Sequence, residues 1–234
     1  MRHIFQIIRR IFNRNLNSSE LSWVNRLEPF SRVFGLDRGS AIDRRFIEKF
    51  LFSHSKLITG DVLEIGDDQY TYKYGNNFRR TVIFAGSFPS GRSEFYAGDL
   101  TKIETFSEIG TFDCLIATNV LNFIYDFDAA VQGLALLIKP DSGSVLATVS
   151  GLTQISRFDY ERWGDYWRFN DVSIRRVFEK YFDNVEIKAY GNAPLAAASI
   201  MGLSQEEVPA NIFEHHDPDY QILIAVKASL PRQR

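Results

Sequence analysis

The fold of this chain is decided by the stretch DVLEIG at residues 61–66, together with a second stretch, FDCLIATN, at residues 112–119. Each is a short apolar run that ends in small or polar residues, which is typical of a strand buried on both faces of a sheet. In an open α/β sheet, ligands bind outside the carboxyl ends of the strands. The two stretches therefore predict a small-molecule site at the edge where they end.

The residues that follow Gly66 indicate the kind of ligand. Asp67 and Asp68 stand where a dinucleotide-binding loop would carry further glycines. Because two carboxylates at a helix N-terminus would repel a pyrophosphate, a cationic or zwitterionic ligand fits better, and S-adenosylmethionine is such a ligand. A nicotinamide oxidoreductase is disfavoured on the same ground. In addition, none of the 10 tyrosines has a lysine four residues later, as a short-chain dehydrogenase would require.

The composition is that of an ordinary globular protein. The chain has 234 residues, of which 45% are hydrophobic, and its formal net charge of −2 gives no reason to expect a nucleic-acid surface. The aromatic content of 14% indicates a site or a partner surface rich in rings. The single cysteine, Cys114, lies in an apolar run and is expected to be a small buried side chain in a reducing cytoplasm.

Residues 2–13 predict a basic amphipathic helix. Their apolar side chains share one face at helical spacing, and Arg2, Arg9 and Arg10 lie on its flanks. The arginines interrupt the apolar run and no small-residue cleavage site follows, so a signal peptide is not expected. We expect this helix to dock on an anionic membrane surface at the inner face of the cell membrane, on a partner enzyme, or on the chain's own domain.

Strand-like and helix-like stretches alternate along the rest of the chain. Strands are expected at residues 61–65, 81–85, 94–97, 112–118, 144–149, 185–190 and 220–228. Helices are expected over residues 128–138, after Asn170, and after Ser40, where Asp43 would complete a capping box. This alternation predicts a mainly parallel sheet, and a long insert before the last strand is consistent with a reversed final strand. Residues 1–40 are expected to form a helical extension, and residues 41–234 the domain.

Taken together, these stretches resemble the class I S-adenosylmethionine-dependent methyltransferases over roughly residues 42–228. Residues 62–66 stand where that family has its first cofactor motif. The fourth strand, its helix and the fifth strand of the family are matched by residues 112–121, 137–143 and 145–149. The resemblance implies a doubly wound, Rossmann-like sheet of seven mainly parallel strands, with the last strand antiparallel. It also implies S-adenosylmethionine as the cofactor.

A narrower set of segments resembles a bacterial methyltransferase-like group found with glycosyltransferases in cell-surface polysaccharide clusters. These segments are residues 34–44, 163–169, 190–192 and 217–220. The resemblance implies methyl transfer to a sugar or glycolipid-linked precursor. Two departures leave an alternative open: the glycines expected after Gly66 are missing, and no acid follows residues 81–85, where the family holds the ribose hydroxyls. The alternative is an inactive methyltransferase fold that serves as the binding partner of a glycosyltransferase.

The predicted cofactor site combines residues from three strand ends. Glu64 is expected to be buried, where it would face the cofactor's ammonium or pair with an arginine. Gly66 would let the backbone approach the ligand, or would simply end the strand. By the resemblance, Asp99 accepts from the adenine amine; by itself it would cap the next helical turn. The predicted cofactor-binding residues are Glu64, Ile65, Gly66, Asp67, Asp99, Leu100 and Asn119.

The acceptor is expected to bind to two segments that follow the fourth and fifth strands. Their aromatic rings could stack on a sugar while charged groups bind its hydroxyls, or they could form a lid packed on the sheet. The predicted substrate-binding residues are Asn122, Tyr125, Trp163, Tyr166, Trp167 and Arg168. A sugar hydroxyl also needs a general base, for which Asp126, Asp165 and His215 are the candidates. The adjacent His215 and His216 lack the spacing of a metal pair, so no metal site is expected.

Overall fold

The computed structural model describes residues 26–86 and 91–232. Contacts within the chain separate residues 1–30 from residues 31–234, and the second unit is the one described below. The helix expected over residues 2–13 lies outside the described residues. Among the helices that the structure does describe, none combines the length and the hydropathy that crossing a membrane requires.

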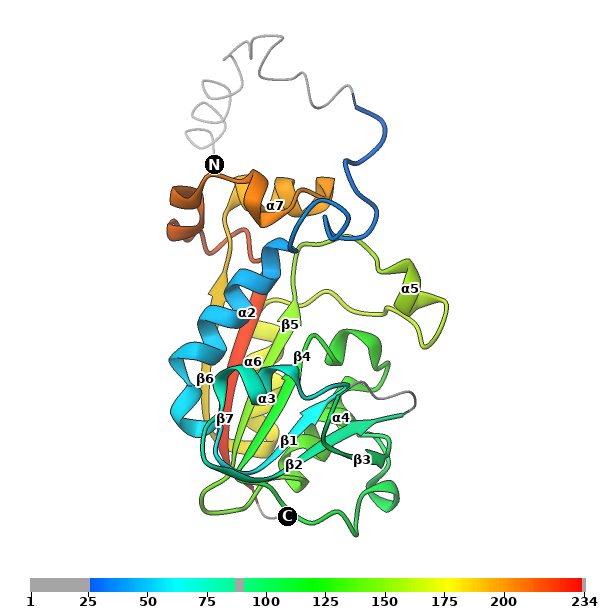
Figure 1. The fold of residues 1–234 in the computed structure, drawn as a ribbon, viewed down its shortest axis with the longest axis vertical. Helices are drawn as coiled ribbons and strands as arrows, with labels where there is room; N and C mark the ends of the chain where they lie inside the picture. The colour runs from blue at the N-terminus through cyan, green and yellow to red at the C-terminus, as the bar shows by residue number, and fades with distance from the viewer. Residues whose placement is uncertain (1–25, 87–90, 233–234) are drawn as a thin grey trace, which may run out of the picture. The chain divides into compact units, whose positions relative to one another are not determined.

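Seven strands form one sheet in the order β3-β2-β1-β4-β5-β7-β6 (Figure 1). The strands are β1 Gly60–Ile65, β2 Phe78–Ala85, β3 Glu94–Ala97, β4 Cys114–Thr118, β5 Ser144–Ser150, β6 Phe182–Tyr190 and β7 Leu223–Pro231. All pair in parallel except β7, which runs antiparallel to both of its neighbours, β5 and β6. The doubly wound, mainly parallel sheet with a reversed last strand is therefore confirmed.

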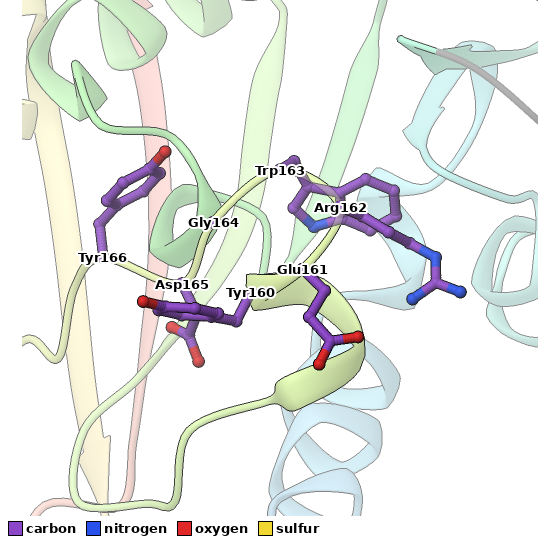
Figure 2. Close-up of a pocket in the computed structure, with 7 residues that line it drawn as sticks. All are labelled: Tyr160, Glu161, Arg162, Trp163, Gly164, Asp165 and Tyr166. Carbon is purple, nitrogen blue, oxygen red and sulfur yellow. The ribbon is translucent and has the colours of Figure 1, made fainter.

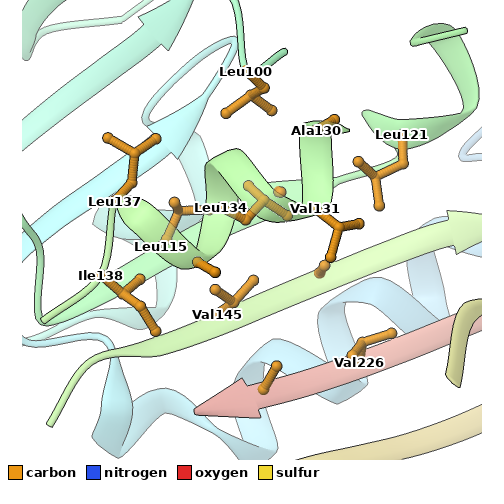
Figure 3. Packing of buried hydrophobic residues seen from close by; sticks show 14 of the residues in the cluster. Leu100, Leu115, Leu121, Ala130, Val131, Leu134, Leu137, Ile138, Val145 and Val226 are labelled. Atoms are coloured by element: carbon orange, nitrogen blue, oxygen red, sulfur yellow. The ribbon is translucent and has the colours of Figure 1, made fainter. Parts of the chain in front are cut away.

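Helices cover both faces of this sheet. The helices that pack on the sheet are α2 Ile42–Ser53, α3 Gln69–Tyr74, α4 Phe127–Leu136, α6 Asp171–Tyr181 and α7 Ala193–Met201; a further short helix, α5 Arg157–Tyr160, contributes no buried residue. Because successive side chains of a strand point to opposite faces, β1 divides between two cores. Leu63 belongs to the core formed with α4 and α6, whereas Val62 belongs to the core formed with α2 and α7. Figure 3 shows Val131 and Leu134 of α4 in the first core, near Leu115 and Val145 of the sheet.

Helix α2 begins differently from the prediction, although its buried stripe from Ile42 to Leu51 is as expected. Its N-cap is Ala41, which makes no side-chain capping bond. The prediction of a capping box formed by Ser40 and Asp43 is therefore wrong. The Ser40 N–H instead donates to Glu206 Oε2 at 2.9 Å, and Asp43 accepts from a residue beyond β4. Tertiary partners thus replace the local cap.

Other elements also differ from the prediction. Strand β7 begins at Leu223 rather than at residue 220, because the preceding residues form a turn in which the Tyr220 N–H donates to the Asp217 carbonyl at 3.2 Å. Helix α3 was not predicted; it has only six residues and begins directly after Asp68. It matters for function because it lies beside the end of β1.

Candidate active site

Strands β1 and β4 are neighbours and end at the same edge of the sheet. Their register pairs Glu64 with Ile116, so Gly66 and Asn119 leave the sheet close to each other. The Asn119 N–H donates to the Thr148 carbonyl at 2.8 Å, which ties this point to the end of β5. The structure thus brings the ends of β1, β4 and β5 together at the edge where the sequence predicts a ligand.

Gly66 combines a left-handed backbone with open surroundings. Its φ is +93°, and its N–H donates to the Phe84 carbonyl at 3.0 Å. No atom lies within 4 Å of the position that a Cβ would occupy. Since glycine adopts this conformation without steric cost, the backbone here is held in place and open to close approach by a ligand.

Glu64 is buried beneath this loop, with 2% of its surface exposed. Its Oε1 accepts from the Tyr70 N–H at 3.1 Å, and its Oε2 accepts from the Thr71 N–H and hydroxyl, each at 2.7 Å. Burial raises the pKa of Glu64 to about 8, although these three hydrogen bonds act in the opposite direction. Glu64 therefore anchors the first turn of α3 to β1, and it forms no ion pair with an arginine among the described residues.

The two aspartates after Gly66 differ in role. Asp68 is buried, and its Oδ2 accepts from the Arg92 N–H at 2.7 Å and from the Ser93 N–H at 2.8 Å. Burial opposes ionisation, but these hydrogen bonds and one from the Ser93 hydroxyl outweigh it and lower the pKa of Asp68. Asp68 thus ties the loop after β1 to the segment before β3. Asp67 is partly exposed and accepts from the Gln69 N–H at 3.0 Å.

Asp99 follows β3 with its side chain 43% exposed. Its Oδ1 accepts from the N–H and the hydroxyl of Thr101, at 2.9 and 2.8 Å, which is the capping role. Its Oδ2 lies 3.3 Å from Lys102 Nζ. Burial works against the charged form, but these hydrogen bonds outweigh it and lower the pKa of Asp99. Oδ2 is therefore the atom that could accept from a ligand, in exchange for Lys102; the adjacent Leu100 is buried.

Asp43 is a site candidate that the sequence reasoning missed. Asn119 Nδ2 donates to Asp43 Oδ2 at 2.9 Å, and Asn119 has a φ of +52°, which is uncommon outside glycine. Burial raises the pKa of the Asp43 carboxyl, and the hydrogen bond from Asn119 opposes that shift. A signal was available: Asp43 precedes Phe46 and Ile47 by three and four residues, so it shares the apolar face of α2.

The segment after β4 supplies framework contacts and one exposed ring. Asn122 is buried; its Nδ2 donates to the Trp167 carbonyl at 2.8 Å, and its Oδ1 accepts from the Ser150 N–H at 3.1 Å. Asp126 caps α4 by accepting from the Ala129 N–H at 3.1 Å. Tyr125 is 69% exposed. Asn122 and Asp126 therefore form hydrogen bonds to the backbone, whereas Tyr125 exposes its ring to solvent.

The segment after β5 contains an ion pair whose carboxylate is buried. The Asp165 side chain is only 1% exposed and binds Arg168 through both carboxylate oxygens, at 2.5 and 2.8 Å. Burial works against ionisation, but Arg168 and the Ser156 N–H outweigh it and lower the pKa of Asp165. The Trp167 indole N–H donates to the Tyr125 carbonyl at 3.1 Å. Asp165, Trp167 and Arg168 therefore serve the framework of this segment.

Other side chains of the same segment face solvent around a hollow of about 480 Å³ (Figure 2). The residues that line it are Tyr160, Glu161, Arg162, Trp163, Gly164, Asp165 and Tyr166. Trp163 and Tyr166 are each about half exposed, and the ring of Tyr125 lies 5.4 Å from that of Tyr166. The contact between Tyr125 and Tyr166 thus joins the segments after β4 and β5, whereas the exposed Trp163 ring packs on Phe158, with 6.3 Å between ring centroids.

His215 lies elsewhere in the chain, between β6 and β7, after the short 3-10 helix Ala210–Glu214. It is exposed, and its carbonyl accepts from Asn192 Nδ2 at 2.8 Å. The three candidate bases therefore come from three separate segments, and two of them, Asp126 and Asp165, already accept hydrogen bonds. Within the described part of the chain, no group of three or more His, Cys, Asp or Glu side chains could hold a metal ion.

The strand order and the reversed β7 define the fold of class I S-adenosylmethionine-dependent methyltransferases. No protein-family model and no curated protein matches the sequence. Among solved structures, the chain is similar to the N-methyltransferase NodS from Bradyrhizobium japonicum WM9 in complex with S-adenosyl-L-homocysteine. The identity is 14% and the TM-score 0.51, over 82% of this chain and 89% of that chain.

Two further structures show the same likeness. One is the complex between the Haloferax volcanii Trm112 methyltransferase activator and a putative methyltransferase, at 15% identity and a TM-score of 0.52, over 85% of this chain and 95% of that chain. The other is an S-adenosylmethionine-dependent methyltransferase from Archaeoglobus fulgidus, at 10% identity and a TM-score of 0.50, over 81% and 94%. At sequence identities of 10–15%, this structural similarity shows the fold alone.

Proposed function

We propose that this chain transfers a methyl group from S-adenosylmethionine. The observation that carries the proposal is Gly66, whose left-handed backbone faces open space at the carboxyl edge of β1. This is the edge where α/β sheets bind ligands, and NodS, which has the same fold, was solved with S-adenosyl-L-homocysteine. The carboxylates of Asp67 and Asp43 near this edge favour a cationic ligand over a pyrophosphate.

The residues present suit such a cofactor. Gly66 and Asp67 would contact its amino-acid part, Asp99 Oδ2 would accept from the adenine amine beside the buried Leu100, and Ile65 and Asn119 would lie beneath it. When bound, the cofactor supplies a methyl group that its sulfonium already activates. The chain therefore needs mainly to orient the acceptor in line with that group and to exclude water.

The adenine contact can be tested with Asp99→Asn. The amide keeps an oxygen that can cap Thr101, but it replaces Oδ2 by a donor that cannot accept from the adenine amine. Loss of a hydrogen bond to a charged group is worth about 1.5–3 kcal/mol. We therefore expect S-adenosylmethionine affinity to fall by about ten- to a hundredfold in calorimetry.

Lys102→Ala is the matched control for this experiment, because it frees Asp99 Oδ2 without changing the carboxylate. Its affinity for the cofactor should be unchanged or higher. If Asp99→Asn binds as the wild type does, or if Lys102→Ala weakens binding as much, Asp99 does not contact adenine.

The inactive alternative is supported by the end of β2, where Ala85 and Gly86 offer no carboxylate for the ribose hydroxyls. Titration of the wild-type chain with S-adenosylmethionine separates the two functions. Saturable binding with transfer of a labelled methyl group supports the enzyme. Absence of any binding heat with millimolar S-adenosylmethionine would leave the binding partner of a glycosyltransferase as the better proposal.

We further propose a sugar or glycolipid-linked acceptor. The support is the exposed aromatic surface made up of the rings of Tyr125, Trp163 and Tyr166, which lie in the segments that follow β4 and β5. Flat rings with polar neighbours suit stacking on a sugar. Arg168 and Asp165 neutralise each other, so the rings rather than this pair would supply most of the contact.

The acceptor surface is tested by Trp163→Ala and Tyr166→Ala. Each removes a half-exposed ring, and such contacts are worth about 0.5–1.5 kcal/mol. We expect the KM for the acceptor to rise roughly two- to tenfold, with unchanged cofactor affinity, in methyl-transfer assays on a panel of nucleotide sugars and lipid-linked oligosaccharides. Trp167→Ala should instead lower the melting temperature, because its ring packs on Phe127 and its N–H is bonded. Unchanged kinetics in both surface variants would remove this surface from the acceptor site.

A further inference from the structure

Asp43 is a carboxylate at the candidate site that forms no ion pair among the described residues. Its Oδ2 accepts from Asn119 Nδ2 at 2.9 Å, and its Oδ1 has no side-chain partner among the described residues. The next residue, Arg44, directs its guanidinium to Gln69 Oε1 at 3.3 Å. A charged group that is withdrawn from water without an ionic partner is costly and marks a candidate functional position.

The position of Asp43 is set by the sheet. Asn119, 76 residues away in the sequence, follows β4 with a φ of +52° and is held by its N–H bond to the Thr148 carbonyl. Strand β4 lies beside β1, which Gly66 directly follows. The carboxylate of Asp43 is therefore hydrogen-bonded to Asn119, at the edge where the cofactor is proposed to bind.

Glu64 is another acid near Gly66, but its carboxyl group is already satisfied. Both of its oxygens accept hydrogen bonds, three in total, from Tyr70 and Thr71 of α3. A ligand that approached Glu64 would have to replace donors that hold the helix to the strand. Among the described residues, Asp43 has one side-chain donor, Asn119, and its other donors are the N–H groups of Asp43 and Arg44 in the first turn of α2, so a ligand there would not have to separate a helix from a strand.

The strand order gives the direction of the ligand. In the sequence β3-β2-β1-β4, Asp99 follows the strand at one end, and Asn119 with Asp43 lies at the other. A ligand whose adenine is bound at Asp99 therefore extends toward Asp43 with its amino-acid part. We propose that Asp43 binds the ammonium group of S-adenosylmethionine and that Asn119 positions its carboxylate, an inference that rests on the function proposed above.

The test uses two ligands that differ in the amino-acid part. S-adenosylhomocysteine carries the ammonium, and 5′-methylthioadenosine lacks it. Asp43→Asn keeps an oxygen for Asn119 but removes the charge. We expect calorimetry on the full chain to show S-adenosylhomocysteine affinity reduced about ten- to a hundredfold, and 5′-methylthioadenosine affinity changed by less than about twofold.

Asp128→Asn is the matched control, because it makes the same change in an exposed carboxylate paired with Lys180 on α4; it should leave both affinities unchanged. Glu64→Gln is the second variant, and it should alter both ligands alike. Equal loss of both ligands in Asp43→Asn, or no loss, would overturn the inference. So would a loss confined to S-adenosylhomocysteine in Glu64→Gln, which remains decisive even if Asp43→Asn does not fold. Wild-type chain that binds neither ligand would instead overturn the proposed function.

Discussion

Gly66→Val is expected to reduce affinity for S-adenosylmethionine by about a hundredfold or more, which corresponds to about 3 kcal/mol of binding free energy. The position has nothing within 4 Å of its Cβ, so the branched side chain would occupy the space proposed for the ligand rather than clash with the protein. Its φ of +93° is unfavourable for valine and should cost about 1–3 kcal/mol of stability. Isothermal calorimetry and thermal unfolding measure the two effects separately.

Gly110→Val provides a matched control for that strain. Gly110 also has a left-handed φ, +84°, and open space at its Cβ position, but it precedes β4 and so lies toward the opposite end of that strand. Both variants should lose similar stability, and only Gly66→Val should lose cofactor binding. If Gly66→Val binds the cofactor as well as Gly110→Val does, the cofactor does not approach the end of β1.

Glu64→Gln is expected to make stability less dependent on pH. Burial raises the pKa of Glu64 from the ordinary 4.5 to about 8, so between these values the folded chain keeps a proton that the unfolded chain has released. The contribution of Glu64 to the stability of the wild-type chain therefore falls as pH rises from about 5 to about 8. The variant does not titrate, and its amide nitrogen cannot accept from Tyr70 or Thr71, which lowers its stability equally at both pH values. Relative to the wild type, it should therefore gain on the order of 4 kcal/mol of stability between pH 5 and pH 8.

Denaturant unfolding of both proteins at the two pH values measures this difference. Glu94→Gln serves as the control, because Glu94 is exposed and paired with Arg80; it should change stability by less than about 1 kcal/mol at both pH values. The opposite trend, in which Glu64→Gln becomes less stable than wild type as pH rises, would mean that the three α3 donors outweigh burial and that Glu64 is ionised in the folded chain.

Patterns that are local in the chain were enough to predict the sheet and its helical layers. The runs at residues 61–66 and 112–119 overlap the buried strands β1 and β4, and the apolar stripe from Ile42 to Leu51 is the buried face of α2. Such features can be read from sequence because burying one face of a helix, or both faces of a strand, imposes a spacing of apolar residues on neighbouring positions. Gly66 was predicted on the same basis, as the residue that stops an apolar run.

The partners of the charged side chains depend instead on long-range folding. The sequence predicts that Asp43 belongs to a local capping box, yet its carboxylate accepts from Asn119. It also allows an ion pair between Glu64 and an arginine, yet the Glu64 side chain accepts from Thr71 of α3. A carboxylate can be satisfied by any donor that folding brings within about 3 Å, and its sequence neighbours do not specify which donor arrives. The periodic burial of apolar groups therefore specifies the framework, whereas the sheet register and helix packing decide which polar groups are left to meet a ligand.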